Sequence, residues 1–202
     1  MPSLEALLMG ISTQHAKDLV AYRPNGMGCY LITCFETPFS TLTAQGWQDG
    51  RPGDCMIISP DFPEHHCATP DMTTGFVNDW LHVIGSAVPE LLSKYQLPCN
   101  TVLHTGSVGL LTTEISAIQE ELYEKKQFFA ERIEILIEML LLKIARSAAE
   151  PEQATHYSPH EARYLPLFLE LRQTMHQNAT APWTIKELAT MVNLSESRFS
   201  VL

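Results

Sequence analysis

Residues 110–150 contain no glycine or proline, and this sets the stretch apart from the rest of the chain. It consists of two runs, 110–126 and 127–150, in which apolar residues are regularly interrupted by polar ones. Glycine and proline are the residues that most disfavour a helix interior, so both runs are predicted to be helices. Any fold for this chain must therefore accommodate a pair of long helices.

The preceding stretch, from about residue 28 to residue 83, has a different texture. Short apolar runs alternate with turn residues, which occur at 46, 49–50 and 52–54 and at the prolines 60, 63 and 70. Several short strands separated by frequent turns indicate an all-β sandwich or barrel. Residues 1–18 read as a mildly amphipathic arm without an assigned structure. The predicted class is mixed α and β, with a β-barrel followed by a helical pair.

The formal net charge of −10 is unevenly distributed along the chain. Residues 159–202 contain four acidic and four basic side chains, so the whole net charge lies in residues 1–158. An acidic surface repels the phosphate backbone, and this region is therefore not expected to bind nucleic acid. Composition favours a sensor or binding domain over a nucleic-acid-binding one for this part.

Hydrophobicity and cysteine content bear on the cellular compartment in which the protein is expected. No apolar stretch reaches roughly 18 residues, and the N-terminus lacks a basic leader, so neither a membrane partner nor a secretory signal is expected. The five cysteines, at 29, 34, 55, 67 and 99, are odd in number and lack CxxC spacing. This pattern favours reduced thiols in a cytoplasmic protein.

The C-terminal residues carry two helix starts. Thr184 precedes an apolar-periodic run and Glu187 follows three residues later, which is the pattern of a capping box. Asn193 suits a tight, left-handed turn, and Ser195 is placed to cap a second helix. Two short helices joined by such a turn form either a DNA-binding helix-turn-helix or a generic helical hairpin, and pattern alone weighs them equally.

A family resemblance favours the first of these. The stretch WTIKELATMVNLSESRFSVL, residues 183–202, resembles the first helix-turn-helix of the AraC/XylS transcription regulators, with W-T-[ILV]-x-x-L-A followed by L-S-x-S-x-[FL]-x-x-L. The resemblance implies operator DNA as a partner, contacted through Ser195, Ser197 and Arg198. Family members continue with a second helix-turn-helix, so this chain is expected to be a part of a longer regulator. The domains are then 1–150 for the sensor, 151–159 for a linker and 160–202 for the start of the DNA-binding part.

The β region carries a second resemblance. RPGDCMIISPDFPEHH, residues 51–66, resembles the cupin-type sensor domain of the same family. On that alignment Cys67, Asn78 and Trp80 fall where sugar-responsive members place inward ligand contacts, and Arg23 and His82 are further candidates. The implied effector is a small polar molecule, with a sugar as one option. Trp80 is either a platform for that effector or part of the barrel core, and the sequence does not choose between them.

Metal-dependent chemistry is the alternative for a cupin, as in an isomerase or dioxygenase. Enzymatic cupins hold a metal through an HxH pair with a Glu and a later His. Here His65 and His66 are adjacent, and adjacent strand residues point to opposite faces. No catalytic residue, metal or cofactor is therefore predicted, and metal analysis would discriminate the two function classes.

The second helical run is apolar on more than one side. Phe129, Ile133, Leu136 and Leu140 follow a heptad-like spacing, and further apolar residues lie between them. A helix with two apolar faces needs two partners, here the barrel and a second subunit, or else it is buried within one domain. The family resemblance favours a homodimer through these four residues. The function predicted is that of a ligand-responsive transcription regulator.

Overall fold

The computed structural model describes residues 4–70, 72–149, 164–178 and 181–201. The chain divides into two compact units, Met1–Thr155 and His156–Leu202, and each is described by itself. The first combines antiparallel sheets with helices and the second is helical, which confirms the predicted mixed α and β class.

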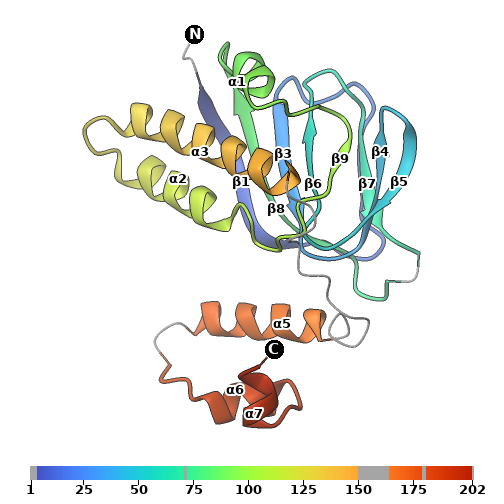
Figure 1. Ribbon diagram of the computed structural model, residues 1–202, viewed down its shortest axis with the longest axis vertical. Coiled ribbons are helices and arrows are strands. Elements are labelled where there is room, and N and C mark those ends of the chain that lie inside the picture. Colours follow the sequence, from blue (N-terminus) through green and yellow to red (C-terminus); the bar gives the residue numbers. More distant parts are fainter. Residues whose placement is uncertain (1–3, 71, 150–163, 179–180, 202) are drawn as a thin grey trace. The chain divides into compact units, whose positions relative to one another are not determined.

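Two antiparallel sheets form the first unit (Figure 1). The five-stranded sheet has the order β1-β8-β3-β6-β9, and the four-stranded sheet has the order β2-β7-β4-β5. The strands are β1 (Glu5–Gln14), β2 (Val20–Arg23), β3 (Tyr30–Phe35), β4 (Phe39–Thr43), β5 (Gly46–Gly50), β6 (Cys55–Ile58), β7 (Glu64–Ala68), β8 (Val77–Ile84) and β9 (Val102–Leu103).

Helices cover one face of the five-stranded sheet, and the four-stranded sheet lies on its other side (Figure 1). The helices are α1 (Val88–Lys94), α2 (Thr112–Glu124) and α3 (Phe129–Ala149). Successive strand residues point to opposite faces. On β3, accordingly, Ile32 and Cys34 join the core beneath the helices, whereas Leu31 and Phe35 lie in clusters on the other side of the sheet.

The two long helices lie where the absence of glycine and proline predicts them, within 110–126 and 127–150. The N-terminal arm, to which the sequence assigned no structure, is the edge strand β1, which pairs with β8 through two register shifts. Along this arm the inward residues therefore change from Leu4 and Ala6 to Met9 and Ile11, and all four pack in the core beneath the helices. A strict two-residue alternation is therefore missing from its sequence.

The second unit contains α5 (Leu165–Gln177), α6 (Ile185–Met191) and α7 (Glu196–Phe199). Both halves of the predicted capping box are present, since Thr184 Oγ1 accepts from the Glu187 amide and the Glu187 carboxylate accepts from the Thr184 amide. Asn193 is left-handed, with φ of 55°, and Ser195 Oγ accepts from the Arg198 amide, as predicted. The predicted linker, 151–159, lies outside the described residues.

Candidate functional site

The space between the two sheets is lined by side chains from both. Phe35 on β3 stacks on Phe39 of β4 with ring centroids 3.4 Å apart, and Phe76 packs beside them. Further along, Thr41 Oγ1 on β4 donates to Met56 Sδ on β6 at 3.5 Å. The inner faces therefore contact each other directly, and polar groups are set among apolar ones.

Trp80 and His82 lie on the inner face of β8. Trp80 packs with Leu31 and other apolar residues, and its ring centroid is 5.1 Å from that of His82. Its indole Nε1 donates to Thr13 Oγ1 at 2.9 Å. Trp80 is half-buried, so one part of the ring fills the core and another part remains accessible. Both functions considered for it from the sequence are compatible with this position.

Asn78, two residues earlier on β8, is almost fully buried. Its Nδ2 donates to Thr33 Oγ1 at 3.0 Å, and its Oδ1 lies 2.9 Å from Nε2 of His15. Thr33 Oγ1 in turn donates to the carbonyl of Asp79 at 3.0 Å. A ligand that binds Asn78 must therefore share or replace bonds that already exist within the protein.

A line of charged and polar groups begins at Arg23. Arg23 Nη1 contacts the carboxylate of Glu64 at 2.5 Å, and the other Glu64 oxygen lies 3.5 Å from His66 Nε2. Glu64 and His66 are both buried, 2% and 4% exposed. His66 Nδ1 has no hydrogen-bond partner among the described residues. It is therefore a buried polar atom that could receive a bond from a ligand.

Burial keeps His66 neutral. Removal from water, followed by the positive charges of nearby groups, lowers the pKa of His66 to about 3. Sequence reasoning missed both Glu64 and His66. The signal was available in principle, because His66 must face inward if His65 faces outward.

His82 makes a polar contact with Cys29 on the inner face of the five-stranded sheet. Its Nδ1 lies 3.6 Å from Cys29 Sγ. Burial lowers the pKa of His82 and raises the pKa of Cys29, so both side chains are held in their neutral forms. Four of the five residues proposed from sequence as effector contacts lie on the inner faces of their sheets, as their strand partners and packing show: Arg23, Asn78, Trp80 and His82.

Cys67 is the exception. Cys67 pairs with Ser40 across β7 and β4, and Ser40 Oγ donates to Asp49 on β5, whereas the next pair, Thr41 and His66, is the buried one. Directly opposed residues share a face and consecutive residues do not. Cys67 therefore lies on the outer face of its sheet, and its predicted position as an inward contact is wrong.

His65 and His66 face opposite sides of β7, as predicted. The His65 ring packs between Tyr22 and Trp47, both more than half exposed, with centroids at 4.8 and 4.5 Å. His104 is exposed and lies 3.1 Å from the buried carboxylate of Asp54. Within the described ranges, no group of three or more His, Cys, Asp or Glu side chains is arranged to hold a metal ion.

The apolar seam predicted to join two subunits lies within the domain. Ile133 and Leu140 belong to the core beneath the helices, and Phe129 and Leu136 pack against that core. The four residues lie on the side of α3 that packs against the sheet and α2. This corrects their assignment to a partner. The exposed apolar residues of α3 are Ile135, Met139 and Leu142, on the opposite side.

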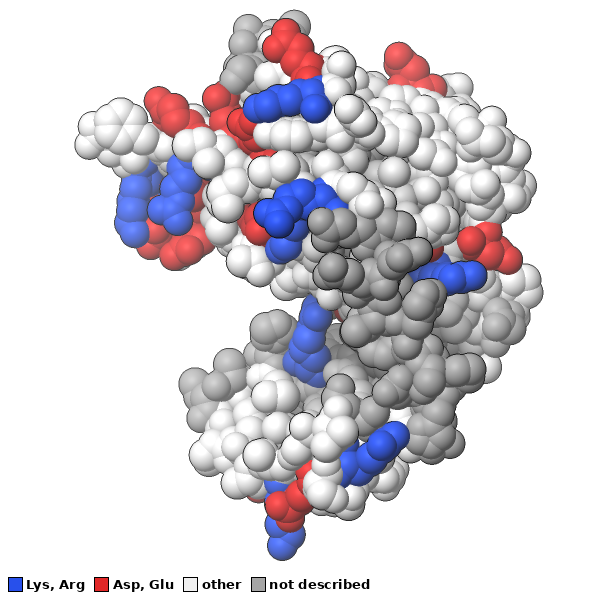
Figure 2. Space-filling view, viewed as in Figure 1, with Lys and Arg blue, Asp and Glu red and all other residues white. Residues whose placement is uncertain are grey.

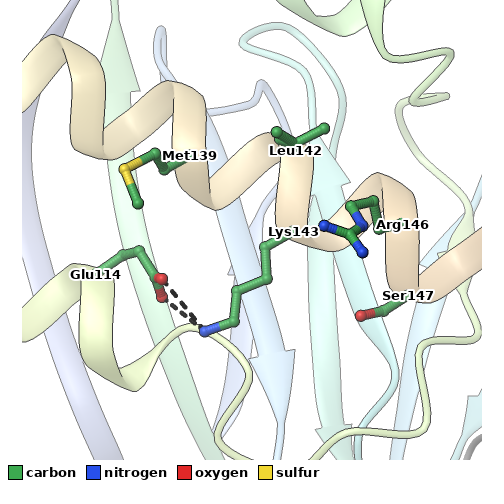
Figure 3. Close-up of a pocket in the computed structure, with 6 residues that line it drawn as sticks. All are labelled: Glu114, Met139, Leu142, Lys143, Arg146 and Ser147. Atoms are coloured by element: carbon green, nitrogen blue, oxygen red, sulfur yellow. Dashed lines mark hydrogen bonds and ion pairs between the residues drawn. The ribbon is translucent and has the colours of Figure 1, made fainter.

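A hollow of about 370 Å³ lies beside this exposed side (Figure 3). Lys143 reaches across it from α3 to Glu114 on α2, with Nζ 2.9 and 3.2 Å from the two carboxylate oxygens. Arg146 and Ser147 line the same hollow one turn later, and Met139 and Leu142 make its apolar part. The Lys143–Glu114 pair ties the two helices together.

The proposed DNA-contacting residues are exposed on the second unit. Ser195, Ser197 and Arg198 lie at or within α7. Ser195 Oγ is already engaged as the helix cap and lies 3.3 Å from Ser197 Oγ. Of the three, Arg198 is the residue whose side chain carries a charge suited to a phosphate or a guanine.

Charged side chains on the first unit are also unevenly placed. On the face in Figure 2, acidic and basic side chains gather over α2 and α3, while the surface over the sheets is largely uncharged.

None of the described helices is long and apolar enough to cross a membrane.

No family model and no curated protein sequence matches the chain. Among solved structures, it is similar to the AraC-like transcriptional activator CuxR, with 15% identity and a TM-score of 0.37 over 87% of this chain and 60% of that one. It is also similar to apo ToxT K231A from Vibrio cholerae strain SCE256, with 10% identity and a TM-score of 0.43 over 98% and 92% of the two chains. The chain is similar as well to unsaturated fatty acid-bound wild-type ToxT from the same strain, with 9% identity and a TM-score of 0.39 over 97% of this chain and 90% of that one. These neighbours are AraC-like regulators.

Proposed function

We propose that the chain is the sensor and the start of the DNA-binding part of a ligand-responsive transcription regulator of the AraC kind. The observation that carries the proposal is the pair α6 and α7, in which two capped helices are joined through a left-handed Asn193. Ala189 and Val192 are buried at this joint, where two crossing helices need close approach. These features support a helix-turn-helix at this position.

Selection of bound duplexes from a random pool at low salt tests the DNA-binding role. Low salt is needed because few phosphate contacts come from a single α7. We expect enrichment of a sequence that Arg198→Ala abolishes. Arg51→Ala, which removes an exposed positive charge from the first unit, is the matched control and should retain it. At moderate salt no protected footprint is expected. Failure to enrich any sequence, or equal enrichment by Arg198→Ala, would contradict the assignment.

The effector in this proposal binds between the two sheets, against Trp80, Asn78, His82 and Arg23. A ring face packs well on the C–H face of a sugar-like molecule, and the neutral imidazoles and the amide offer directed hydrogen bonds. A thermal-shift screen over sugars and polar metabolites should find a stabilising ligand. By calorimetry, Trp80→Ala should weaken its binding, and Asn78→Ala should cost on the order of 1 kcal/mol.

The control for that site is Cys67→Ala, because Cys67 lies on the outer face and should leave affinity unchanged. If Trp80→Ala lowers the melting temperature sharply and leaves affinity unchanged, Trp80 belongs to the core alone. The metalloenzyme alternative predicts a stoichiometric metal in the purified protein, and elemental analysis decides it.

We propose that the homodimer forms through the exposed side of α3. Ile135, Met139 and Leu142 are 58%, 50% and 40% exposed and lie on one helical face. The same face begins with Glu131 and ends with Arg146, which form no ion pair with any described residue. Two copies of α3 packed antiparallel bring Ile135 opposite Leu142 and Glu131 opposite Arg146. In this arrangement apolar residues oppose apolar residues and opposite charges oppose each other.

Charge reversal tests this arrangement. Glu131→Arg or Arg146→Glu alone places like charges opposite each other and should shift the chain toward monomer in light scattering. The double variant restores two opposite pairs and should recover the dimer. A monomeric unmutated chain, or a double variant no better than either single one, would overturn the antiparallel arrangement.

A further inference from the structure

Two of the five free cysteines are opposed across neighbouring strands. Cys34 on β3 and Cys55 on β6 are direct partners in the antiparallel register. Both belong to the core beneath the helices, so their side chains share one face of the sheet. They are 1% and 0% exposed.

The hydrogen-bond pattern specifies the kind of pair. The amide of Phe35 donates to the carbonyl of Asp54 at 2.9 Å, one position further along each strand. Hydrogen-bonded and non-hydrogen-bonded pairs alternate along an antiparallel ladder, so Cys34 and Cys55 form a non-hydrogen-bonded pair. The Cα atoms of such a pair are about 4.5 Å apart, and disulfides form at Cα separations of roughly 4.4–6.8 Å. The backbone is already arranged for a bond between the two sulfurs.

The thiols also hold a neighbouring loop. Cys34 Sγ donates to the carbonyls of Gly53 and Ser107, at 3.7 and 3.8 Å, and Cys55 Sγ lies 3.6 Å from Thr105 Oγ1. Gly53 has φ of 87°, and a Cβ there would lie 2.6 Å from the amide of Ser107. The segment 105–107, which leads toward α2, is therefore pressed against the 53–54 turn directly over the sulfurs.

We propose that Cys34 and Cys55 are a pair that hydrogen peroxide oxidises slowly to a disulfide, and that this oxidation loosens the segment that leads into α2. One sulfur attacks a peroxide oxygen, the O–O bond breaks, and a sulfenic acid and water form. The second sulfur attacks the sulfenic sulfur, the S–O bond breaks, and a second water leaves. Two thiols are oxidised by two electrons in total, and hydrogen peroxide is reduced to two waters.

The resting state of the pair is reduced. Hydrogen bonding with Cys55, followed by burial, raises the pKa of Cys34 well above its usual value, so its thiol is protonated and slow to react. Complete burial admits an oxidant the size of water far more readily than a bulky disulfide. The pair is thereby selective for peroxide over larger disulfide oxidants.

Oxidation removes the hydrogen bonds that the Cys34 thiol donates to the neighbouring loop. A disulfide carries no S–H, so the carbonyls of Gly53 and Ser107 lose the donor that Cys34 now provides. The new bond also closes the chain between residues 34 and 55, which restricts the unfolded state. The oxidised protein is therefore expected to melt higher, by roughly 6–13 °C, while amides in 105–112 exchange faster.

Peptide mass spectrometry of the peroxide-treated chain tests the proposal. The expected product is a cross-linked peptide pair containing Cys34 and Cys55, together with the higher melting temperature and faster exchange at 105–112. Cys34→Ala and Cys55→Ala should each abolish all three changes. Cys67→Ala, which removes a more accessible thiol on the outer face, should leave them intact.

Cys67 also serves as an internal indicator of the oxidant in the unmutated chain. The proposal is overturned if Cys67 is oxidised while Cys34 and Cys55 stay reduced. It is equally overturned if the cross-links formed join other cysteines, or if the Cys34–Cys55 bond forms without faster exchange at 105–112. The unmutated chain decides these outcomes even where an alanine variant fails to fold.

Discussion

Met139 and Leu140 are neighbours on α3 and face opposite environments. Leu140 is fully buried beneath the helices, whereas Met139 is half exposed on the proposed dimer face. Truncating a fully buried leucine to alanine removes its transfer free energy and leaves a cavity, with a total cost of about 3 kcal/mol. Truncating an exposed methionine in the monomer costs less than about 0.5 kcal/mol. The pair Leu140→Ala and Met139→Ala therefore separates core packing from association.

Urea unfolding at several protein concentrations measures both effects. At concentrations where the chain is monomeric, Leu140→Ala should lower the free energy of unfolding by about 3 kcal/mol, and Met139→Ala should match the unmutated chain. At higher concentrations the unmutated chain should gain stability through dimerisation, and Met139→Ala should gain less. Light scattering of the same samples gives the oligomeric state directly.

The opposite pattern would refute this reasoning. If Leu140→Ala leaves the monomer as stable as before and only dissociates the dimer, then the seam of Phe129, Ile133, Leu136 and Leu140 joins two subunits after all. If both variants destabilise the monomer equally, α3 is enclosed on both sides within one domain. Neither result is compatible with the burial of Leu140 and the exposure of Met139.

Three further predictions concern single side chains. Thr184→Ala removes the cap of α6 and should cost about 1 kcal/mol of stability in the second unit, seen as lower helicity on heating, whereas Thr190→Ala should cost much less. Burial lowers the folded-state pKa of His66 to about 3, whereas the unfolded-state pKa is about 6.5. The contribution of neutral His66 to the free energy of unfolding is therefore present above pH 6.5. It is lost as the pH falls below that value, by up to about 1.4 kcal/mol per pH unit. Between pH 7 and 5 the stability of His66→Gln should therefore fall less steeply with pH than that of the unmutated chain. The same pH dependence in both proteins would rule this out. Lys143→Met leaves the largely buried Glu114 unpaired and should destabilise the first unit by about 1–2 kcal/mol, and adding Glu114→Gln should recover most of the loss in thermal unfolding.

Local signals predict much of the fold because their causes are local. The capping box at Thr184 and the left-handed Asn193 depend on residues within one turn, and both are present. The two long helices follow from the lack of glycine and proline. In contrast, β1 carries two register shifts and shows no regular alternation, so an edge strand cannot be recognised from its sequence.

The side on which a residue lies is harder to predict, because it depends on what packs there. On α3 apolar residues occur all round the helix, so periodicity indicates two buried or covered faces without saying which one meets the sheet. Cys67 shows the same problem for a strand. Its type and position do not reveal its face, but its neighbour His66 does, since one inward residue places the next one outward.

The strongest indication of a ligand between the sheets is energetic. An interior that only had to hold two sheets together would be more stable with apolar side chains in place of Glu64 and His66, because burying polar groups is costly. An unpaired buried acceptor or donor such as His66 Nδ1 costs about 1–3 kcal/mol. A molecule that supplies the missing bond recovers this free energy on binding. In the proposed effector site the same unpaired atom would add affinity for molecules that carry a matching hydroxyl and none for those that lack it, so the proposal predicts selectivity for polar ligands.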